Sequence, residues 1–485
     1  MNIAAVTDRG TRQPQAFLNG EVHDWYRTVW GYSDHLVANL LKEFATSETR
    51  VLDPFCGSGT TLVECMKHGL DSAGVDANPV SYLAAKVKTN WRLNPDRLGT
   101  LLEELEVPYG RSLSGRAHLK DPTYLYLEET GMLDRGWISN EPLKKAIAIK
   151  HAIRDSKTTS LYKEAMTLAL LNTLLRTAAN VKFGPELYCG KQKEDADVFG
   201  DFAKRITSMA GDLQLAKLLI PGAAVVVEGD SRYCGSLREQ LGKPKFSLVI
   251  CSPPYPAEHD YTRNSRLELA FLEKVSDRET LREIKRRMVR SHTKGIYTGD
   301  HDANLVAKNP ILTKLTARID LRAADKSHGF ARLYSKVTTE YFGGMKRHMK
   351  SLLPLLKKDA IVAYVLGDQS SYLQVPVKTA RILASLANEL SYETVEIRHW
   401  RDRVSSFEFY CWRHTFGTRA SQSGMDRFTL ARLMGHSSPS VAARYYIHVT
   451  ETHVADGFGK FVEYQIRNVA EGFAAAFPPA SEAVQ

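Results

Sequence analysis

The stretch Asp53–Thr61, which reads DPFCGSGTT, decides the fold. It follows the apolar run at 50–55 and leads into a helical pattern from Thr60 to His68. A strand, a glycine-rich turn and a helix in succession are typical of parallel α/β sheets that bind a nucleotide-like ligand at their carboxyl edge. Gly57 and Gly59 would let the backbone approach such a ligand closely. Taken alone, this turn is equally typical of an ordinary strand-to-helix connection.

Further strand-like runs support an α/β sheet with crossover helices. They read SAGVD at 72–76, AVVVEGD at 224–230, FSLVICSPPY at 246–255, AIVAYVLGD at 360–368 and YETVEIRHW at 392–400. Asp76 ends the second strand, where a carboxylate can accept hydrogen bonds from both hydroxyls of a ribose. Asp230 ends another strand, at a position suited to an adenine amino group. The alternative for either residue is a helix cap or a turn.

The loop Ser252-Pro253-Pro254-Tyr255 follows a buried strand and contains two consecutive prolines. The prolines stiffen the backbone and leave carbonyl groups without amide donors. We expect the Ser252 hydroxyl and the Pro253 carbonyl to hold a planar amino group, and Tyr255 to stack on the ring that carries it. Without the glycine-rich turn upstream, a simple strand cap would be the better interpretation.

Two insertions interrupt the strand pattern. Residues 95–220 have mainly helical periodicity, and residues 256–350 form a second, basic insertion. Within it, residues 276–350 hold 17 basic and 8 acidic side chains, so most of the net charge of +10 lies there. Such a concentration favours a polyanionic partner. We expect phosphate contacts from this insertion, the alternative being a solvated helix face: Arg282, Lys285, Arg286, Arg287, Arg290 and Lys294.

The combination of DPFCGSGTT and SPPY resembles the amino-group DNA methyltransferases, over roughly residues 20–403. The resemblance implies a Rossmann-like sheet, S-adenosylmethionine as methyl donor and DNA as partner. A restriction endonuclease is a further partner that such a protein can have. It implies a helix near Gly31 to Leu40 over the methionine end of the donor. It also implies donor contacts at Asp53, Phe55, Gly57, Gly59, Asp76 and Asp230.

The same resemblance suggests the target atom. Ser-Pro-Pro-Tyr is more typical of cytosine-N4 enzymes, whereas adenine-N6 enzymes more often begin this loop with Asp or Asn. We therefore expect direct transfer to cytosine N4, with the base flipped out of a duplex or single-stranded. Methylation of adenine N6 or of RNA is the alternative. The order of the motifs leaves target recognition open between 95–220 and 256–345.

Residues 404–485 form a separate segment whose stretch 410–449 resembles the end of tyrosine recombinases. By that resemblance Arg413 and His436 would contact a scissile phosphate, and Tyr446 would be the nucleophile. The upstream catalytic Arg and Lys of that family have no counterpart, so we expect an incomplete, mainly α-helical remnant. An integrase-type protein or a DNA-binding fusion is the alternative. FEFYCW at 407–412 falls where methyltransferase sheets end in an antiparallel strand, so truncation after Arg403 would leave an aggregating core.

The remaining features point to a cytoplasmic protein without a membrane span. The six cysteines form no C-x-x-C pair, so neither a disulfide framework nor a thiolate zinc site is indicated. The N-terminus lacks the apolar segment of a signal peptide. No metal-binding motif is present, and GDHDAN at 299–304 is interpreted as a polar loop.

Overall fold

The computed structural model describes residues 2–8, 21–28, 31–183, 187–242, 245–324, 329–367 and 371–401. Contacts within the chain divide it into two compact units, Met1–Arg401 and Asp402–Gln485. The second unit lies outside the described residues, as do the FEFYCW segment, Arg413, His436 and Tyr446.

The first unit alternates strands and helices around two insertions. Its strands are β1 (Asn2–Asp8), β2 (Val51–Asp53), β3 (Ser72–Asp76), β4 (Val181–Phe183), β5 (Leu187–Cys189), β6 (Ala224–Glu228), β7 (Phe246–Cys251), β8 (Leu356–Leu366), β9 (Ser371–Tyr372), β10 (Val375–Pro376) and β11 (Glu393–Arg401). Its helices are α1 (Asp34–Phe44), α2 (Thr60–Lys67), α3 (Pro79–Lys88), α4 (Pro95–Ser114), α5 (Pro122–Glu129), α6 (Asn140–Asp155), α7 (Ser160–Thr173), α8 (Val198–Ala216), α9 (Gly235–Leu241), α10 (Tyr261–Asn264), α11 (Arg266–Phe271), α12 (Arg278–Arg286), α13 (Pro310–Ala324), α14 (Tyr334–Leu352) and α15 (Thr379–Asn388).

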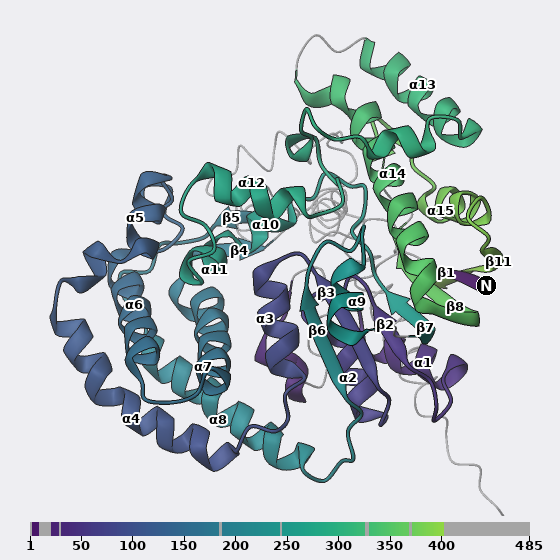
Figure 1. Cartoon of the computed structure of the whole chain (residues 1–485). Coiled ribbons are helices and arrows are strands. Elements are labelled where there is room, and N and C mark those ends of the chain that lie inside the picture. Colours follow the sequence, from purple (N-terminus) through teal and green to yellow (C-terminus); the bar gives the residue numbers. More distant parts are fainter. Residues whose placement is uncertain are drawn as a thin grey trace, which may run out of the picture. The chain divides into compact units, whose positions relative to one another are not determined.

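Seven strands form one sheet in the order β11-β1-β8-β7-β2-β3-β6, and all of its strand pairs are parallel (Figure 1). The chain leaves β2 toward β3 and β6, and then returns to place β7 and β8 on the other side of β2. The strand order therefore reverses between β2 and β7, which creates a crevice at their carboxyl ends. The predicted Rossmann-like α/β class is confirmed.

The place between β8 and β11 is filled by the N-terminal strand β1, which pairs in parallel with both. The sequence predicts a first unit that begins at residue 20 and a final antiparallel strand from the C-terminal segment. The structure instead builds this part of the sheet from residues 2–8. The partner strands are more than 350 residues away in the sequence, so no local pattern could reveal the pairing.

Alternate residues of the central strands enter different hydrophobic layers, as the two-residue period of a strand requires. Leu248 and Ile250 of β7 pack in the cluster that contains α1. Val249 and Cys251 pack in the cluster that contains α14 and α15. The sheet is thus covered on both faces, which explains why its strands have nearly continuous apolar sequences.

Three helices begin at an Asx-Pro pair. Asn78, Asn94 and Asp121 each accept a hydrogen bond from the backbone amide two residues later, with proline at the first helical position. This combination is favoured because proline lacks the amide that would otherwise be unsatisfied. It fixes where α3, α4 and α5 start.

Helices α4–α8 form the predicted helical insertion and share a hydrophobic core with α3 (Figure 1). The insertion also contains the short antiparallel pair β4-β5, which was not expected from the sequence. Among the described helices, none has a length and apolar content sufficient to cross a membrane.

Candidate functional site

A cavity opens at the carboxyl ends of the central strands, where the strand order reverses. Its lining brings together eight of the ten residues assigned from the sequence to the donor and acceptor sites: Phe55, Gly57, Asp76, Asp230, Ser252, Pro253, Pro254 and Tyr255. Asp53 and Gly59 are not among the lining residues. Segments about 200 residues apart in the sequence therefore meet at one place.

The glycine-rich loop is tied to the end of β3. The Gly57 amide donates a hydrogen bond of 2.9 Å to Asp76 Oδ2, and the Asn78 amide donates one of 2.8 Å to Oδ1. Gly57 has φ of +51°, and a Cβ placed there would meet nothing within 4 Å. The backbone at Gly57 thus borders open space, into which a ligand can approach closely. Burial raises the pKa of Asp76 to about 6.

Asp53, at the end of β2, accepts hydrogen bonds that hold the glycine-rich loop in place. It is fully buried, and it accepts hydrogen bonds from the Phe55 amide at 3.0 Å, the Thr61 hydroxyl at 2.5 Å and the Tyr32 hydroxyl at 3.2 Å. Burial raises its pKa to about 7, although these hydrogen bonds oppose the shift. Its hydrogen bonds shape the loop, and the donor contact expected from the sequence stays a prediction.

Gly59 is required by packing. It caps α2 with φ of +87°, and an added Cβ would lie 3.0 Å from the Ala85 Cα. The residue therefore permits α2 and α3 to approach each other, and its contact with a ligand stays a prediction.

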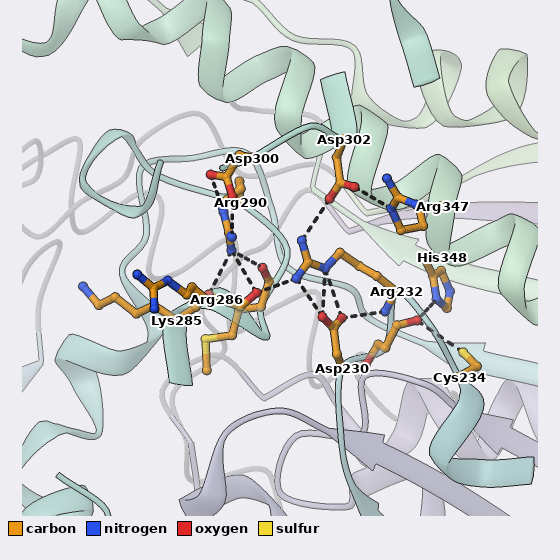
Figure 2. A network of polar contacts seen from close by, with 12 residues as sticks. Asp230, Arg232, Cys234, Lys285, Arg286, Arg290, Asp300, Asp302, Arg347 and His348 are labelled. Carbon is orange, nitrogen blue, oxygen red and sulfur yellow. Dashed lines mark hydrogen bonds and ion pairs between the residues drawn. The ribbon is translucent and has the colours of Figure 1, made fainter. Parts of the chain in front are cut away.

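Asp230 lies on the cavity wall but is engaged by Arg232 (Figure 2). Arg232 Nε lies 3.0 Å from Oδ1 and 3.1 Å from Oδ2, and a terminal nitrogen lies 2.7 Å from Oδ2. The same guanidinium reaches Asp302 at 2.9 Å. A carboxylate held in this way has a fixed position, and any adenine contact would have to share it with Arg232.

The Ser-Pro-Pro-Tyr loop presents its two proline carbonyls differently. The Pro254 carbonyl accepts a hydrogen bond of 2.8 Å from the Tyr341 hydroxyl of α14. No described residue donates to the Pro253 carbonyl. The Ser252 hydroxyl lies 2.9 Å from the Tyr255 hydroxyl. The structure therefore fixes one end of the loop and leaves acceptors at the other.

Tyr261 supports the loop from the following helix, because its hydroxyl accepts a hydrogen bond of 3.0 Å from the Tyr255 amide. Lys285 then fixes the start of that helix through Asp260, at 2.6 Å. Burial opposes ionisation of Asp260, but the Lys285 charge prevails and the pKa of Asp260 falls to about 2. Tyr261, Tyr341 and Asp260 were missed in the sequence because they belong to no motif.

Glu268 is a further carboxyl on the cavity lining that the sequence gave no reason to select. It is 1% exposed, and its Oε1 accepts a hydrogen bond of 2.7 Å from the Tyr26 hydroxyl. Its Oε2 is buried without a hydrogen-bond partner. Burial raises the pKa of Glu268 to about 7.

The six basic residues predicted to contact DNA divide into two groups. Arg290 is 4% exposed and makes a two-point ion pair with Asp300, while Lys285 pairs with Asp260. These two are engaged in ion pairs within the fold, and their contact with DNA stays a prediction. The other four are more exposed: Arg282, Arg286, Arg287 and Lys294.

Several known proteins are similar in sequence to parts of this chain. A family model described as DNA methylase matches residues 32–86. The Type II methyltransferase M.BsoBI of Geobacillus stearothermophilus is 27% identical over 300 residues, covering 56% of this chain and 56% of that protein. The Type II methyltransferase M.MvaI of Kocuria varians is 24% identical over 306 residues, covering 59% of this chain and 66% of that protein.

A different relative is Transposase B from transposon Tn554 of Staphylococcus aureus, 28% identical over 135 residues, which is 25% of this chain and 21% of that protein. This match is shorter than the two above. The methyltransferase similarities agree with the meeting of the glycine-rich loop and the Ser-Pro-Pro-Tyr loop in one cavity. Over the matched stretches, this chain is similar to DNA methylases of the N6/N4 type.

Proposed function

We propose that this protein transfers a methyl group from S-adenosylmethionine to the exocyclic amino group of a DNA base, and that the base is cytosine. The observation that carries the proposal is the meeting of a carboxylate-bearing donor loop and an acceptor-rich proline loop at one crevice. The names of the relatives, which are Type II methyltransferases, support the reaction class.

The cavity residues fit this donor. Asp76 and Glu268 are carboxyls with no cationic partner among the described residues, and Asp76 can still accept hydrogen bonds from ribose hydroxyls. Gly57 borders open space. When bound, S-adenosylmethionine supplies a methyl group activated by a positively charged sulfur. Uncompensated carboxyls favour such a ligand, because its charge offsets theirs.

The acceptor loop determines which nucleotide atom can react. The Ser252 hydroxyl and the Pro253 carbonyl are two oxygen acceptors on a rigid backbone, and an amino group offers two N–H donors. Hydrogen bonds to both oxygens would orient the amino nitrogen and direct its lone pair toward the donor side of the cavity. Such alignment is the main contribution that a protein makes to a direct transfer.

Cytosine N4 is the finer part of the proposal and rests on Ser252. Serine at the first position of the loop is more typical of enzymes that act on cytosine, as noted above. The neutral hydroxyl can accept from the amino group and simultaneously interact with the Tyr255 hydroxyl, 2.9 Å away.

The test is transfer of labelled methyl to mixed-sequence duplex DNA, with RNA of the same sequence as the control. We expect label in DNA from the unchanged chain and at least tenfold less from Ser252→Ala. Label in RNA alone, or equal label from both proteins, would contradict the proposal.

A further inference from the structure

A second hollow, with a volume of about 690 Å³, lies beside the catalytic cavity. Five arginines, two aspartates and two tyrosines contribute to its lining. The two spaces are adjacent: Asp230 and Arg287 line the catalytic cavity, whereas Arg232 and Arg286 line the hollow. A ligand in the hollow would therefore lie next to the cavity of the proposed reaction.

Ion pairs connect several of the residues that line the hollow (Figure 2). Arg232 joins Asp230 to Asp302, and Arg290 pairs with Asp300. Arg232 and Arg290 also donate to backbone carbonyls of the segment 285–288. The guanidinium groups of Arg232 and Arg290 are thus already engaged in contacts within the protein. They also neutralise the two aspartates of the lining, Asp302 and Asp300.

Three arginines remain at the rim with unused donors: Arg282, Arg286 and Arg347. Arg347 uses Nε to contact Asp302 at 2.5 Å, and none of the described residues accepts from its terminal nitrogens. Arg282 and Arg286 each use one terminal nitrogen, and both contact the exposed Glu279, at 3.2 and 2.8 Å. Since a guanidinium has five N–H donors, each arginine retains several for a ligand.

Two tyrosines contact two of these rim arginines, Arg286 and Arg347. Tyr233 has Arg232 and Arg347 at 5.7 and 5.6 Å from its ring centre, and Tyr297 has Arg286 and Arg290 at 5.4 and 5.3 Å. Each ring stacks one buried arginine and one rim arginine. This arrangement pre-orients the rim guanidinium groups and reduces the entropy that binding would cost.

We propose that this hollow binds backbone phosphate of the nucleic acid whose base enters the neighbouring cavity, through Arg286 and Arg347 with Arg282 at the rim. The chemistry is that of a phosphate diester, whose oxygens match the paired donors of a guanidinium. The inference rests on the proposed function, because it assumes that DNA is the substrate. Contacts of this kind position the strand without specifying its sequence.

The experiment measures DNA affinity against salt concentration for the whole protein and for Arg286→Gln and Arg347→Gln. Arg50→Gln is the matched control, because Arg50 is exposed and precedes β2, at the amino end of that strand and not at its carboxyl end. Each lost phosphate contact lowers the slope of log affinity against log salt by about 0.9. We expect that decrease, and weaker binding at about 50 mM salt, in both variants and not in the control.

Cofactor binding serves as the check on folding, and we expect S-adenosylmethionine affinity to be unchanged in the two variants. Unchanged DNA affinity and slope in correctly folded variants would overturn the inference while methyl transfer by the unchanged chain still supported the proposed function. No DNA methylation by the unchanged chain would instead refute the proposed function.

A second arm distinguishes strand phosphate from free phosphate. Inorganic phosphate is titrated while the melting temperature is followed. If phosphate stabilises the unchanged chain but not Arg286→Gln, and the DNA salt slopes are equal, the hollow serves a free anion and the backbone proposal is wrong. We expect little stabilisation by phosphate alone and the slope change with DNA.

Discussion

The hydroxyl of Tyr341 in α14 donates a hydrogen bond of 2.8 Å to the carbonyl oxygen of Pro254. This contact joins a fully buried helix residue to the loop that we propose holds the target amino group. It fixes the direction of the Pro254 carbonyl and so holds one end of the loop. Tyr341 acts through the loop and is therefore a positioning residue.

Tyr341→Phe should lower kcat while KM for S-adenosylmethionine stays the same. Loss of the hydrogen bond should also cost roughly 1 kcal/mol of stability. Steady-state kinetics and thermal unfolding measure the two effects. A loss of stability with unchanged kcat would show that the contact is structural only.

Tyr255→Ala should lower methyl transfer by about 5-fold to 150-fold, because base stacking on an aromatic ring contributes roughly 1 to 3 kcal/mol. Tyr255→Phe keeps the ring and removes the hydroxyl, with its contacts to the Ser252 hydroxyl and the Val365 carbonyl. We expect Tyr255→Phe to retain more activity than Tyr255→Ala. Equal activity of Tyr255→Ala and the unchanged protein would exclude this loop as the base site.

Cofactor affinity should rise with pH through about 6, because burial raises the pKa of Asp76 to that value and the ionised carboxylate is the better acceptor for ribose hydroxyls. Calorimetric titration with S-adenosylmethionine between pH 5 and 8 measures it. Asp76→Asn should bind more weakly at pH 8 and lose this dependence. The same pH slope in both proteins would assign the titration to another group.

Glu268→Gln should change the dependence of stability on pH. The folded protein raises the Glu268 pKa from 4.5 to about 7 through burial, so the folded state holds its proton more tightly than the unfolded state. Stability from this group is therefore present below pH 4.5 and is lost as pH rises to about 7, by roughly 3 kcal/mol. Relative to the unchanged chain, the variant should gain stability over this range.

Denaturant unfolding at pH 5 and pH 8 measures this difference. The exposed Glu103→Gln in α4 is the control and should track the unchanged chain at both pH values. If Glu268→Gln also shows no relative gain at pH 8, Glu268 is not a buried carboxyl in solution.

A chain ending at Arg403 should fold and melt cooperatively, because the seven strands of the described sheet lie within residues 2–401. This reverses the expectation of an aggregating core, which assumed a strand from the C-terminal segment. Deleting residues 2–8 should be more damaging, since β1 joins β8 to β11. An aggregating truncate at Arg403 would restore the earlier view.

The sequence revealed the central sheet because its strands and turns are signalled locally. DPFCGSGTT and SPPY each contain their own turn chemistry, and parallel strands bring their carboxyl ends together. The contributions of β1, Tyr341 and Glu268 depend on partners far away in the chain, which no local pattern encodes. Likewise, the charge of Arg290 suggested DNA contact, but only the structure shows that Arg290 forms an ion pair with Asp300.

The most direct test of the central claim is the identity of the modified base. DNA treated with the protein and labelled S-adenosylmethionine is digested to nucleosides, and the product is identified by mass spectrometry. Our account predicts N4-methylcytosine, which should be lost with Ser252→Ala. Methylation at cytosine C5, or no methylated nucleoside from a folded protein that binds the cofactor, would contradict amino-group transfer, whereas N6-methyladenine would contradict the assignment to cytosine.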